Sequence, residues 1–321
     1  MSSLNINIES IPKVRTVLNI QSHVVHGYVG NKASTFPLQM LNWEVDVMNT
    51  VNFSNHTGYG SFRGSCATGQ ELLELYDGLR ESGFQYDAVL TGYVSGHETL
   101  VAVGKICTDL KLKAMDEGKN ITWLLDPVMG DEGQLYVEEN VIPVYRRLLE
   151  SKLVDIVTPN QYELELLLDK EISSIENLKT SLSLFHDRFN VKHVVLSSLF
   201  ADKFDDLEGG SDTIYCCVSS ILCEKLVFFK IEKIDSYFTG VGDLFSSLLL
   251  DRITSMDDVA EAVNEALTVM KKVLFVTKNM TTTKGVIGDK HMKDCELRVV
   301  ECKNFYEQHD KFYEPILISK K

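Results

Sequence analysis

The sequence lacks a Cys-x-x-Cys pair, an excess of basic residues and an apolar run long enough to span a membrane. Its seven cysteines are scattered, which predicts free thiols in a reducing compartment instead of a zinc or redox motif. Lys and Arg total 32 against 46 Asp and Glu, and this balance argues against nucleic-acid partners, since these require a basic surface. With no signal-peptide core and no membrane segment, the sequence predicts a cytoplasmic protein, and entry into the nucleus stays open.

Short apolar runs rich in Val, Ile and Leu alternate with helical stretches over the first two thirds of the chain. Runs of this kind are typical of parallel strands that are buried on both faces. The expected strands are 16–21, 45–51, 88–92, 121–125, 153–157 and 193–197. The expected helices are 32–41, 69–82, 96–117, 138–150, 161–168 and 175–189. Because no linker or repeat interrupts this alternation, the sequence predicts one doubly wound α/β domain.

The last third of the chain follows a different pattern. Segments 213–218 and 225–229 predict a hairpin or edge strands, and 296–300 predicts a further edge strand. The acidic segment 201–212 is expected to be a solvated loop, with a mobile flap as the alternative. A helix is expected over 257–278, where apolar residues recur every three or four positions.

Two N-terminal helix signals stand out in this part of the sequence. Ser255 and Asp258 have the spacing of a capping box for the helix over 257–278. Gly240, Val241, Gly242 and Asp243 lead directly into another apolar helix. A Gly-x-Gly turn before a helix lets backbone amides approach an anion, and the helix dipole favours negative charge there. The alternative is a turn with an acidic N-cap.

Two further polar clusters follow predicted strands, where ligands of open α/β sheets bind. Asp126 and Asp131 come after the strand 121–125 and could hold Mg²⁺, or they could be ordinary turn residues. Thr158 follows the strand 153–157, and Asn160 and Glu163 have the spacing of a capping box. Capping would not prevent Asn160 or Glu163 from also facing a metal-bound phosphate.

The loops 21–32 and 53–60 are rich in hydroxyl, His, Asn and Gly residues, and each follows a strand. Such loops bring little apolar burial, which favours a binding surface for a small polar molecule. His23, His26 and His56 would permit a zinc site, but no carboxylate or cysteine lies at ligand spacing.

Taken together, these strings resemble the pyridoxal kinases of the ribokinase-like superfamily. The matching segments are 21–39, 53–60, 90–96, 126–137, 157–167, 238–250 and 296–303, in family order. The resemblance implies a single-domain three-layer α/β/α sandwich with a mostly parallel central sheet. It places the kinase domain at 15–303, between a flexible N-terminal extension over 1–14 and a C-terminal tail over 304–321.

The resemblance also implies an activity, the ATP-dependent phosphorylation of the 5′-hydroxymethyl group of pyridoxal, pyridoxine or pyridoxamine. Asp243 matches the catalytic base, and the amides of Gly240, Val241 and Gly242 match the anion hole. Three side chains match contacts to the pyridine ring, namely Ser22, Thr57 and the stacking residue Tyr93. A homodimer is expected from the resemblance alone.

On the nucleotide side, the resemblance implies that a divalent cation, normally Mg²⁺, and a monovalent cation such as K⁺ act with ATP. Asp126 and Thr158 match the region of the monovalent cation and the nucleotide, and Asp131 and Glu163 match the Mg–ATP side. The remaining nucleotide positions are Asn160, Ser197, where the family usually has Thr, and Tyr136, in a lid over 133–137. The predicted metal ligands are Asp126, Asp131, Thr158 and Glu163.

The sequence departs from the family pattern at Val241, where the family usually has Thr. This change removes a hydroxyl beside the phosphates and restricts the loop, so reduced activity or altered nucleotide handling is expected. Two alternatives to an active pyridoxal kinase therefore stay open. One is a hydroxymethylpyrimidine kinase on the same fold, and the other is a catalytically weak protein that binds B6 vitamers.

Overall fold

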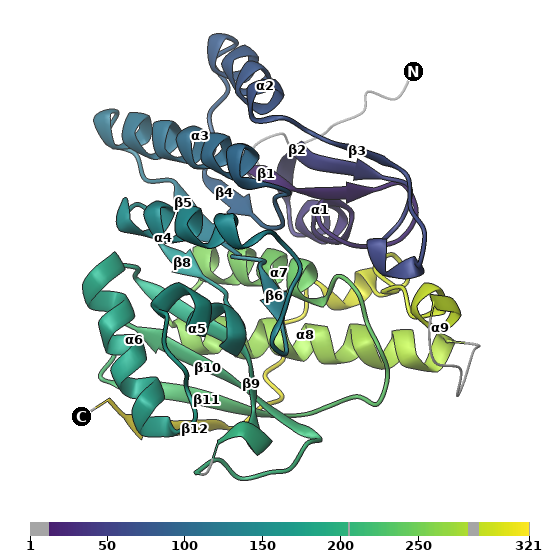
Figure 1. The fold of residues 1–321 in the computed structure, drawn as a ribbon, viewed down its shortest axis with the longest axis vertical. Helices are drawn as coiled ribbons and strands as arrows, with labels where there is room; N and C mark the ends of the chain where they lie inside the picture. The colour runs from purple at the N-terminus through teal and green to yellow at the C-terminus, as the bar shows by residue number, and fades with distance from the viewer. Residues whose placement is uncertain (1–12, 205, 282–288, 321) are drawn as a thin grey trace, which may run out of the picture.

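The computed structural model of the chain describes residues 13–204, 206–281 and 289–320. Nearly all of the predicted extension over 1–14 lies outside these residues. Within them, one ten-stranded sheet runs in the order β12-β11-β10-β9-β8-β5-β4-β1-β2-β3, from the bottom of Figure 1 to its top. The strands are β1 (Arg15–Val24), β2 (Trp43–Phe53), β3 (Gly64–Cys66), β4 (Ala88–Thr91), β5 (Thr122–Leu125), β8 (Ile156–Val157), β9 (His193–Phe200), β10 (Thr213–Ser220), β11 (Lys225–Glu232) and β12 (Pro315–Ser319).

The centre of the sheet is parallel and its two edges are antiparallel. β1 pairs in parallel with β2 and β4, and the parallel run continues through β5 and β8 to β9. The added strands β3, β10, β11 and β12 are antiparallel to their neighbours. The expectation of a mostly parallel sheet is therefore confirmed. Because the carboxyl ends of parallel strands meet at one edge, the loops that follow them are brought together.

Helices cover both faces of the sheet, so the domain has three layers (Figure 1). The helices are α1 (Asn31–Met40), α2 (Gly69–Glu81), α3 (His97–Asp116), α4 (Ile142–Glu150), α5 (Gln161–Leu168), α6 (Ile175–Phe189), α7 (Val241–Ser255), α8 (Val259–Met280) and α9 (Asp289–Asp294). α2 to α6 pack on one face, and α1, α7 and α8 pack on the other. Successive residues of β1, such as Val17 and Leu18, contribute to opposite cores, as the period of a strand requires.

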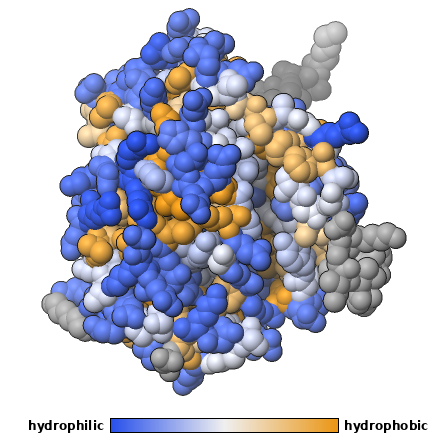
Figure 2. Space-filling model, in the orientation of Figure 1, coloured by the Kyte–Doolittle hydropathy of each residue, from blue (hydrophilic) through white to orange (hydrophobic). Residues whose placement is uncertain are grey.

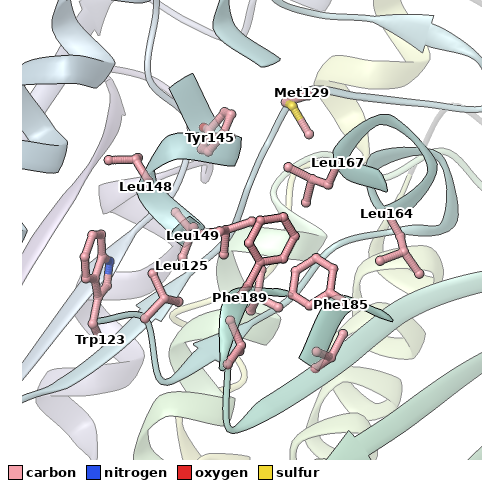
Figure 3. Close-up of a cluster of buried hydrophobic side chains, with 14 of the residues drawn as sticks. Trp123, Leu125, Met129, Tyr145, Leu148, Leu149, Leu164, Leu167, Phe185 and Phe189 are labelled. Atoms are coloured by element: carbon pink, nitrogen blue, oxygen red, sulfur yellow. The ribbon is translucent and has the colours of Figure 1, made fainter. Parts of the chain in front are cut away.

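The larger core joins β5 to α4, α5 and α6. Figure 3 shows Trp123 and Leu125 of β5 in one cluster of buried side chains with residues of these helices. Phe185 and Phe189 of α6 meet edge to face, with ring centroids 4.7 Å apart. Because these side chains are fully buried, they hold the strand β5 and thereby fix the loop that follows it.

The outer surface is mostly polar, in line with the acidic composition. Figure 2 shows hydrophilic residues over most of the visible face, with hydrophobic residues in smaller patches toward its centre. In the described part of the chain, no helix combines the length and the apolar composition needed to cross a bilayer.

Most predicted elements are confirmed, and five expectations need correction. The strand over 153–157 is reduced to Ile156–Val157, and the helix over 138–150 begins with the 3-10 turn η3 (Glu139–Val141) before α4. Residues 296–300 form no strand and continue from α9 as irregular chain, in which residues 296, 297 and 299 are buried. The segment 304–321, expected as a tail, contributes β12, which pairs with β11 from Lys225↔Ser319 to Phe229↔Pro315.

The capping box predicted for α8 is also wrong, because Ser255 is not its N-cap residue. Asp258 is the N-cap residue, and its carboxylate accepts hydrogen bonds from the amides of Ala260 and Glu261 at 2.8 and 3.2 Å. Ser255 instead ends α7, where its hydroxyl donates to the Asp251 carbonyl at 2.8 Å. A hydroxyl within the last turn finds a carbonyl four residues earlier, so it does not reach the next helix.

The acidic segment 201–212 is exposed for the most part, as expected for a loop, but hydrophobic residues anchor it. It starts with the 3-10 turn η4 (Ala201–Lys203), and Phe204 is buried in the larger core. Asp206 accepts the amide of Ile175 at 3.0 Å, at the start of α6. The contacts of Phe204 and Asp206 hold the first half of this loop against the domain.

Candidate active site

The glycine turn lies at the N-terminus of α7 and presses against the loop between β1 and α1. Gly240 is the N-cap residue and has a left-handed backbone, with φ 77°. A Cβ on Gly240 would lie 2.0 Å from the carbonyl oxygen of Tyr28, so only glycine fits. Within the described residues, no side chain caps α7. The amides of its first turn are therefore available to an anion.

Asp243 lies in the first turn of α7 and is joined to the start of α1. Its Oδ2 accepts a hydrogen bond from the amide of Gly30 at 2.7 Å. Burial raises the pKa of the Asp243 carboxyl, and the hydrogen bond from Gly30 opposes this rise. The Gly30 backbone in turn lies against Ser22, because the Cβ that Gly30 lacks would be 2.3 Å from Ser22 Oγ. The predicted base and one predicted ring contact are thus brought together.

Asp126 is buried directly beside this helix terminus. Its Oδ2 accepts the hydroxyl of Ser246, on α7, at 3.1 Å, and lies 3.6 Å from the Cβ position of Gly242. The Thr158 hydroxyl lies 3.2 Å from Ser246 Oγ. Burial, and then the negative charge of Asp243, raise the pKa of Asp126 to about 7. Ser246 was not predicted, although its position one helical turn after Asp243 could have suggested it.

Asn160 and Glu163 form the predicted capping box of α5. Asn160 Oδ1 accepts the Glu163 amide and Glu163 Oε2 accepts the Asn160 amide, both at 2.9 Å. Both side chains also hold the loop after β5: Glu163 Oε1 accepts the Met129 amide at 2.9 Å, and Asn160 Nδ2 donates to the Gly130 carbonyl at 2.7 Å. Burial, followed by the charge of Asp126, raises the pKa of Glu163 well above its ordinary value.

Asp131, Tyr136 and Ser197 come from β6 (Gly130–Asp131), the residue after β7 (Gln134–Leu135), and β9. Asp131 belongs to a small hairpin of β6 and β7, and Tyr136 follows it with an exposed ring. Burial, and then the charge of Asp131, raise the pKa of Tyr136 to about 12. Ser197 donates its hydroxyl to the Pro159 carbonyl at 3.4 Å.

Two lysines that the sequence reasoning did not single out lie near Asp131. Lys203 and Lys233 both lie over the ring of Phe200, 4.7 and 4.6 Å from its centroid. Their positive charges oppose the rise that burial causes in the pKa of Asp131. They come from different loops, so no local motif joins them in the sequence.

The predicted vitamer contacts come from two loops and a strand end. Thr57 begins the 3-10 turn η2 (Thr57–Tyr59) and has an exposed side chain. Before it, His56 Nδ1 accepts the Gly58 amide at 3.2 Å, and burial lowers the pKa of this histidine. Tyr93 is half-buried, and its carbonyl accepts the Thr50 hydroxyl at 2.8 Å. In residues 13–204, 206–281 and 289–320, no three His, Cys, Asp or Glu side chains are grouped to hold a metal ion.

The family model described as phosphomethylpyrimidine kinase matches residues 81–288. A putative pyridoxal kinase of Saccharomyces cerevisiae is 44% identical over 306 residues, which cover 91% of this chain and 95% of the yeast protein. The chain belongs to the pyridoxal kinase family. The human pyridoxal kinase is 40% identical over 249 residues, 73% of this chain and 76% of the human one.

The fold agrees with that of solved members of the pyridoxal kinase family. The pyridoxal kinase of Leishmania donovani in complex with ADP and pyridoxine superposes with a TM-score of 0.83 at 30% identity, over 94% of this chain and 99% of the other. The same enzyme in complex with ADP and pyridoxamine gives a TM-score of 0.83. The expected ribokinase-like architecture is therefore confirmed.

Proposed function

We propose that the protein transfers the γ-phosphoryl group of ATP to the 5′-hydroxymethyl group of pyridoxal, pyridoxine or pyridoxamine. The observation that carries this proposal is the position of Asp243, in the first turn of an uncapped helix and beside Gly30 and Ser22. A carboxylate at this place can accept a proton while the neighbouring amides face a phosphoryl group. The pyridoxal kinase of Leishmania donovani binds ADP together with pyridoxine or pyridoxamine.

In the proposed reaction, Asp243 takes the proton of the substrate hydroxyl as its oxygen forms a bond to the γ-phosphorus. The bond between that phosphorus and the bridging oxygen breaks, and ADP leaves. The amides of Gly240, Val241 and Gly242 stabilise the charge on the transferred group, since they are fixed before the reaction begins. The raised pKa of Asp243 suits a base that must hold the proton after transfer.

The vitamer is held on the other side of Asp243. Ser22 and Thr57 supply hydroxyls suited to the ring nitrogen and the 3-hydroxyl, and Tyr93 supplies an aromatic surface for stacking. Ser22 already lies against Gly30, whereas the exposed Thr57 leaves its hydroxyl open to a ligand. Tyr136 is the residue we propose for the lid, because its ring is exposed at the edge of the β6–β7 hairpin.

The residues around Asp126 fit a hard cation. Among the described residues, the groups that set the pKa of Asp126 are Asp243, Ser246 and Thr158, and none of them is a cation. A buried acidic pair with oxygen donors only is the donor set that Mg²⁺ or K⁺ accepts, with phosphate and water completing the shell. Such a cation would screen the phosphate charges. We propose Asp126 and Thr158 as its nearest ligands.

We propose less direct roles for Glu163 and Asp131 than for Asp126 and Thr158. Three backbone amides already occupy the carboxylate of Glu163, so it would act on a cation through water or through the loop that it fastens. Asp131 Oδ1 accepts the Glu132 amide at 2.8 Å, which leaves its other oxygen for the nucleotide side. Asn160 and Ser197 would border the phosphates from α5 and β9.

A second candidate is the phosphorylation of hydroxymethylpyrimidine, which the description of the matching family model favours. The same base and anion hole would serve both substrates, because both present a primary alcohol on a heterocycle. The two differ in ring contacts, so Thr57 and Tyr93 are the residues on which the choice depends.

The test is to incubate the purified protein with Mg–ATP, K⁺ and either alcohol, and to measure the phosphorylated product by chromatography. We expect pyridoxal 5′-phosphate, and about a 10²–10⁴-fold lower kcat for Asp243→Asn. Asp257→Asn, an exposed acid between α7 and α8, is the matched control. Pyridoxal that binds in calorimetry without turnover would favour the vitamer-binding alternative, and product from hydroxymethylpyrimidine alone would favour the second candidate.

We place this activity in the cytoplasm, with nuclear entry open, because Cys66 and Cys223 are exposed thiols, as is typical of proteins in a reducing compartment. We also propose that the protein works as a homodimer, as the family resemblance implies. Light scattering coupled to size-exclusion chromatography tests the dimer directly.

A further inference from the structure

Glu296 is a buried carboxylate that the sequence reasoning left without a role. It follows α9 in the chain and is only 7% exposed. Its Oε2 accepts the backbone amide of Tyr28 at 2.7 Å. A Cβ on Gly27 would lie 2.2 Å from Glu296 Oε1, so the carboxylate is set into the backbone of the loop between β1 and α1. A side chain at residue 27 would push the two apart.

The loop held by Glu296 is the loop that contacts the base. Tyr28 is fixed on both sides: its amide meets Glu296, and its carbonyl oxygen lies 2.0 Å from the Cβ position of Gly240. Two residues later, Gly30 donates its amide to Asp243 at 2.7 Å. A shift of Tyr28 would therefore move both the glycine turn and the amide that orients the base.

The segment that carries Glu296 is itself rigidly anchored. Leu297 and Val299 are buried in the smaller core, and the Arg298 amide donates to Thr277 Oγ1 of α8 at 3.1 Å. Burial raises the pKa of Glu296, while the Tyr28 amide and the charges of His26, Lys32 and Arg298 oppose that rise. The backbone that carries Glu296 is therefore held by α8 and the smaller core, and its carboxylate is hydrogen-bonded to the Tyr28 amide.

The same segment reaches the second vitamer loop. Met292 Sδ would lie 2.5 Å from a Cβ on Gly58, so α9 packs closely on η2, beside Thr57. A cavity of about 390 Å³ lies between this segment and the loop at residues 26–28. Tyr28 and Glu296 both line this cavity, and the hydrogen bond between them joins the loop to the segment after α9.

We infer that Glu296 is a positioning residue, which holds Tyr28 so that Gly30 and the α7 glycine turn meet Asp243 in the productive arrangement. This inference rests on the proposed kinase function. Glu296 touches neither substrate in this assignment. We therefore expect its contribution to depend on the length of its side chain and not on its charge. Its removal is expected to lower kcat for phosphoryl transfer, because small displacements of reacting groups slow a reaction strongly.

The test compares two substitutions that separate the effect of side-chain length from the effect of charge. Glu296→Gln keeps an oxygen at the same distance and loses the charge, whereas Glu296→Asp keeps the charge and is one methylene too short for Tyr28. We expect Glu296→Asp to lower kcat about 10–100-fold with KM for ATP within about twofold, and Glu296→Gln to keep at least about a third of kcat. Glu301→Gln, an exposed acid that lines the same cavity, is the control.

Each outcome separates the inference from the proposed function. An active wild type with Glu296→Asp as fast as Glu296→Gln, or faster, would overturn the positioning role and leave the kinase assignment intact. No product from wild type would overturn both. If Glu296→Asp does not fold, as judged by thermal unfolding, Glu296→Gln still decides: a folded Gln variant with more than a tenfold loss of kcat contradicts the inference.

Discussion

The amide of Gly30 donates a 2.7 Å hydrogen bond to Asp243 Oδ2 across a separation of 213 residues. This bond joins the N-termini of α1 and α7, two helices on the same face of the sheet. It ties the proposed base to the loop that also carries the Tyr28 contact with Glu296. The orientation of Asp243 therefore depends on packing between segments from the two ends of the chain.

The first prediction concerns the cation. Asp126→Asn removes a buried charge beside Asp243, so the cation that we propose there loses its main protein ligand. We expect the Mg²⁺ concentration for half-maximal activity to rise at least about tenfold, measured by titrating Mg²⁺ at saturating ATP and pyridoxal. Asp257→Asn should match the wild type. An unchanged titration curve would remove Asp126 from the cation site.

The second prediction concerns the vitamer. Thr57→Ala removes an exposed hydroxyl at the start of η2 while leaving the backbone turn in place. Calorimetry should show pyridoxal binding weakened by about 1–3 kcal/mol, because a polar group of the ligand loses its partner. Ser61→Ala, another exposed hydroxyl of the same loop, should bind pyridoxal normally. Equal affinities for wild type and Thr57→Ala would place Thr57 outside the vitamer site.

The third prediction concerns the departure from the family pattern at the first residue of α7. Val241→Thr restores a hydroxyl beside the backbone amides, and a hydrogen bond to a phosphate oxygen would add to their effect. We expect kcat/KM for ATP to rise roughly threefold to tenfold. Steady-state kinetics at varied ATP measure this. No change would mean that the amides of the turn suffice by themselves.

The fourth prediction concerns stability in acid. Burial lowers the pKa of His193 to about 4, below its ordinary value of 6.5. The unfolded chain therefore takes up a proton at a higher pH than the folded protein does, so stability falls as the pH drops from about 6.5 to about 4. The variant His193→Gln should lose about 1–2 kcal/mol less of its unfolding free energy than wild type over this range.

Urea denaturation at pH 7 and at pH 4.5 measures that difference. The buried Nδ1 of His193 has no hydrogen-bond partner among the described residues, which is consistent with a neutral ring in the folded protein. His97→Gln, at the start of α3, serves as the control and should follow the wild type. The same pH dependence in His193→Gln and wild type would contradict the assignment.

Two errors of the sequence-based prediction have a common physical cause. Residues 296–300 have the alternation of an edge strand, yet they form irregular chain, because Glu296 and Arg298 pair with Tyr28 and Thr277. β12 was missed because its strand partner β11 lies far away in sequence, and no local turn signal joins them. In both cases a distant partner, not local propensity, decided the structure.

The sequence by itself determined the alternation of strands and helices, the family resemblance and the residue types at each strand end. These follow from the periods of buried strands and helices and from short motifs, all of which act within a few residues. The tertiary structure alone decided which groups meet: the Ser246 hydroxyl with Asp126, the Gly30 amide with Asp243 and the Tyr28 amide with Glu296. Such pairs form only when the sheet order and the packing of both helical layers bring distant segments together, because a sequence motif carries no information about its spatial neighbour.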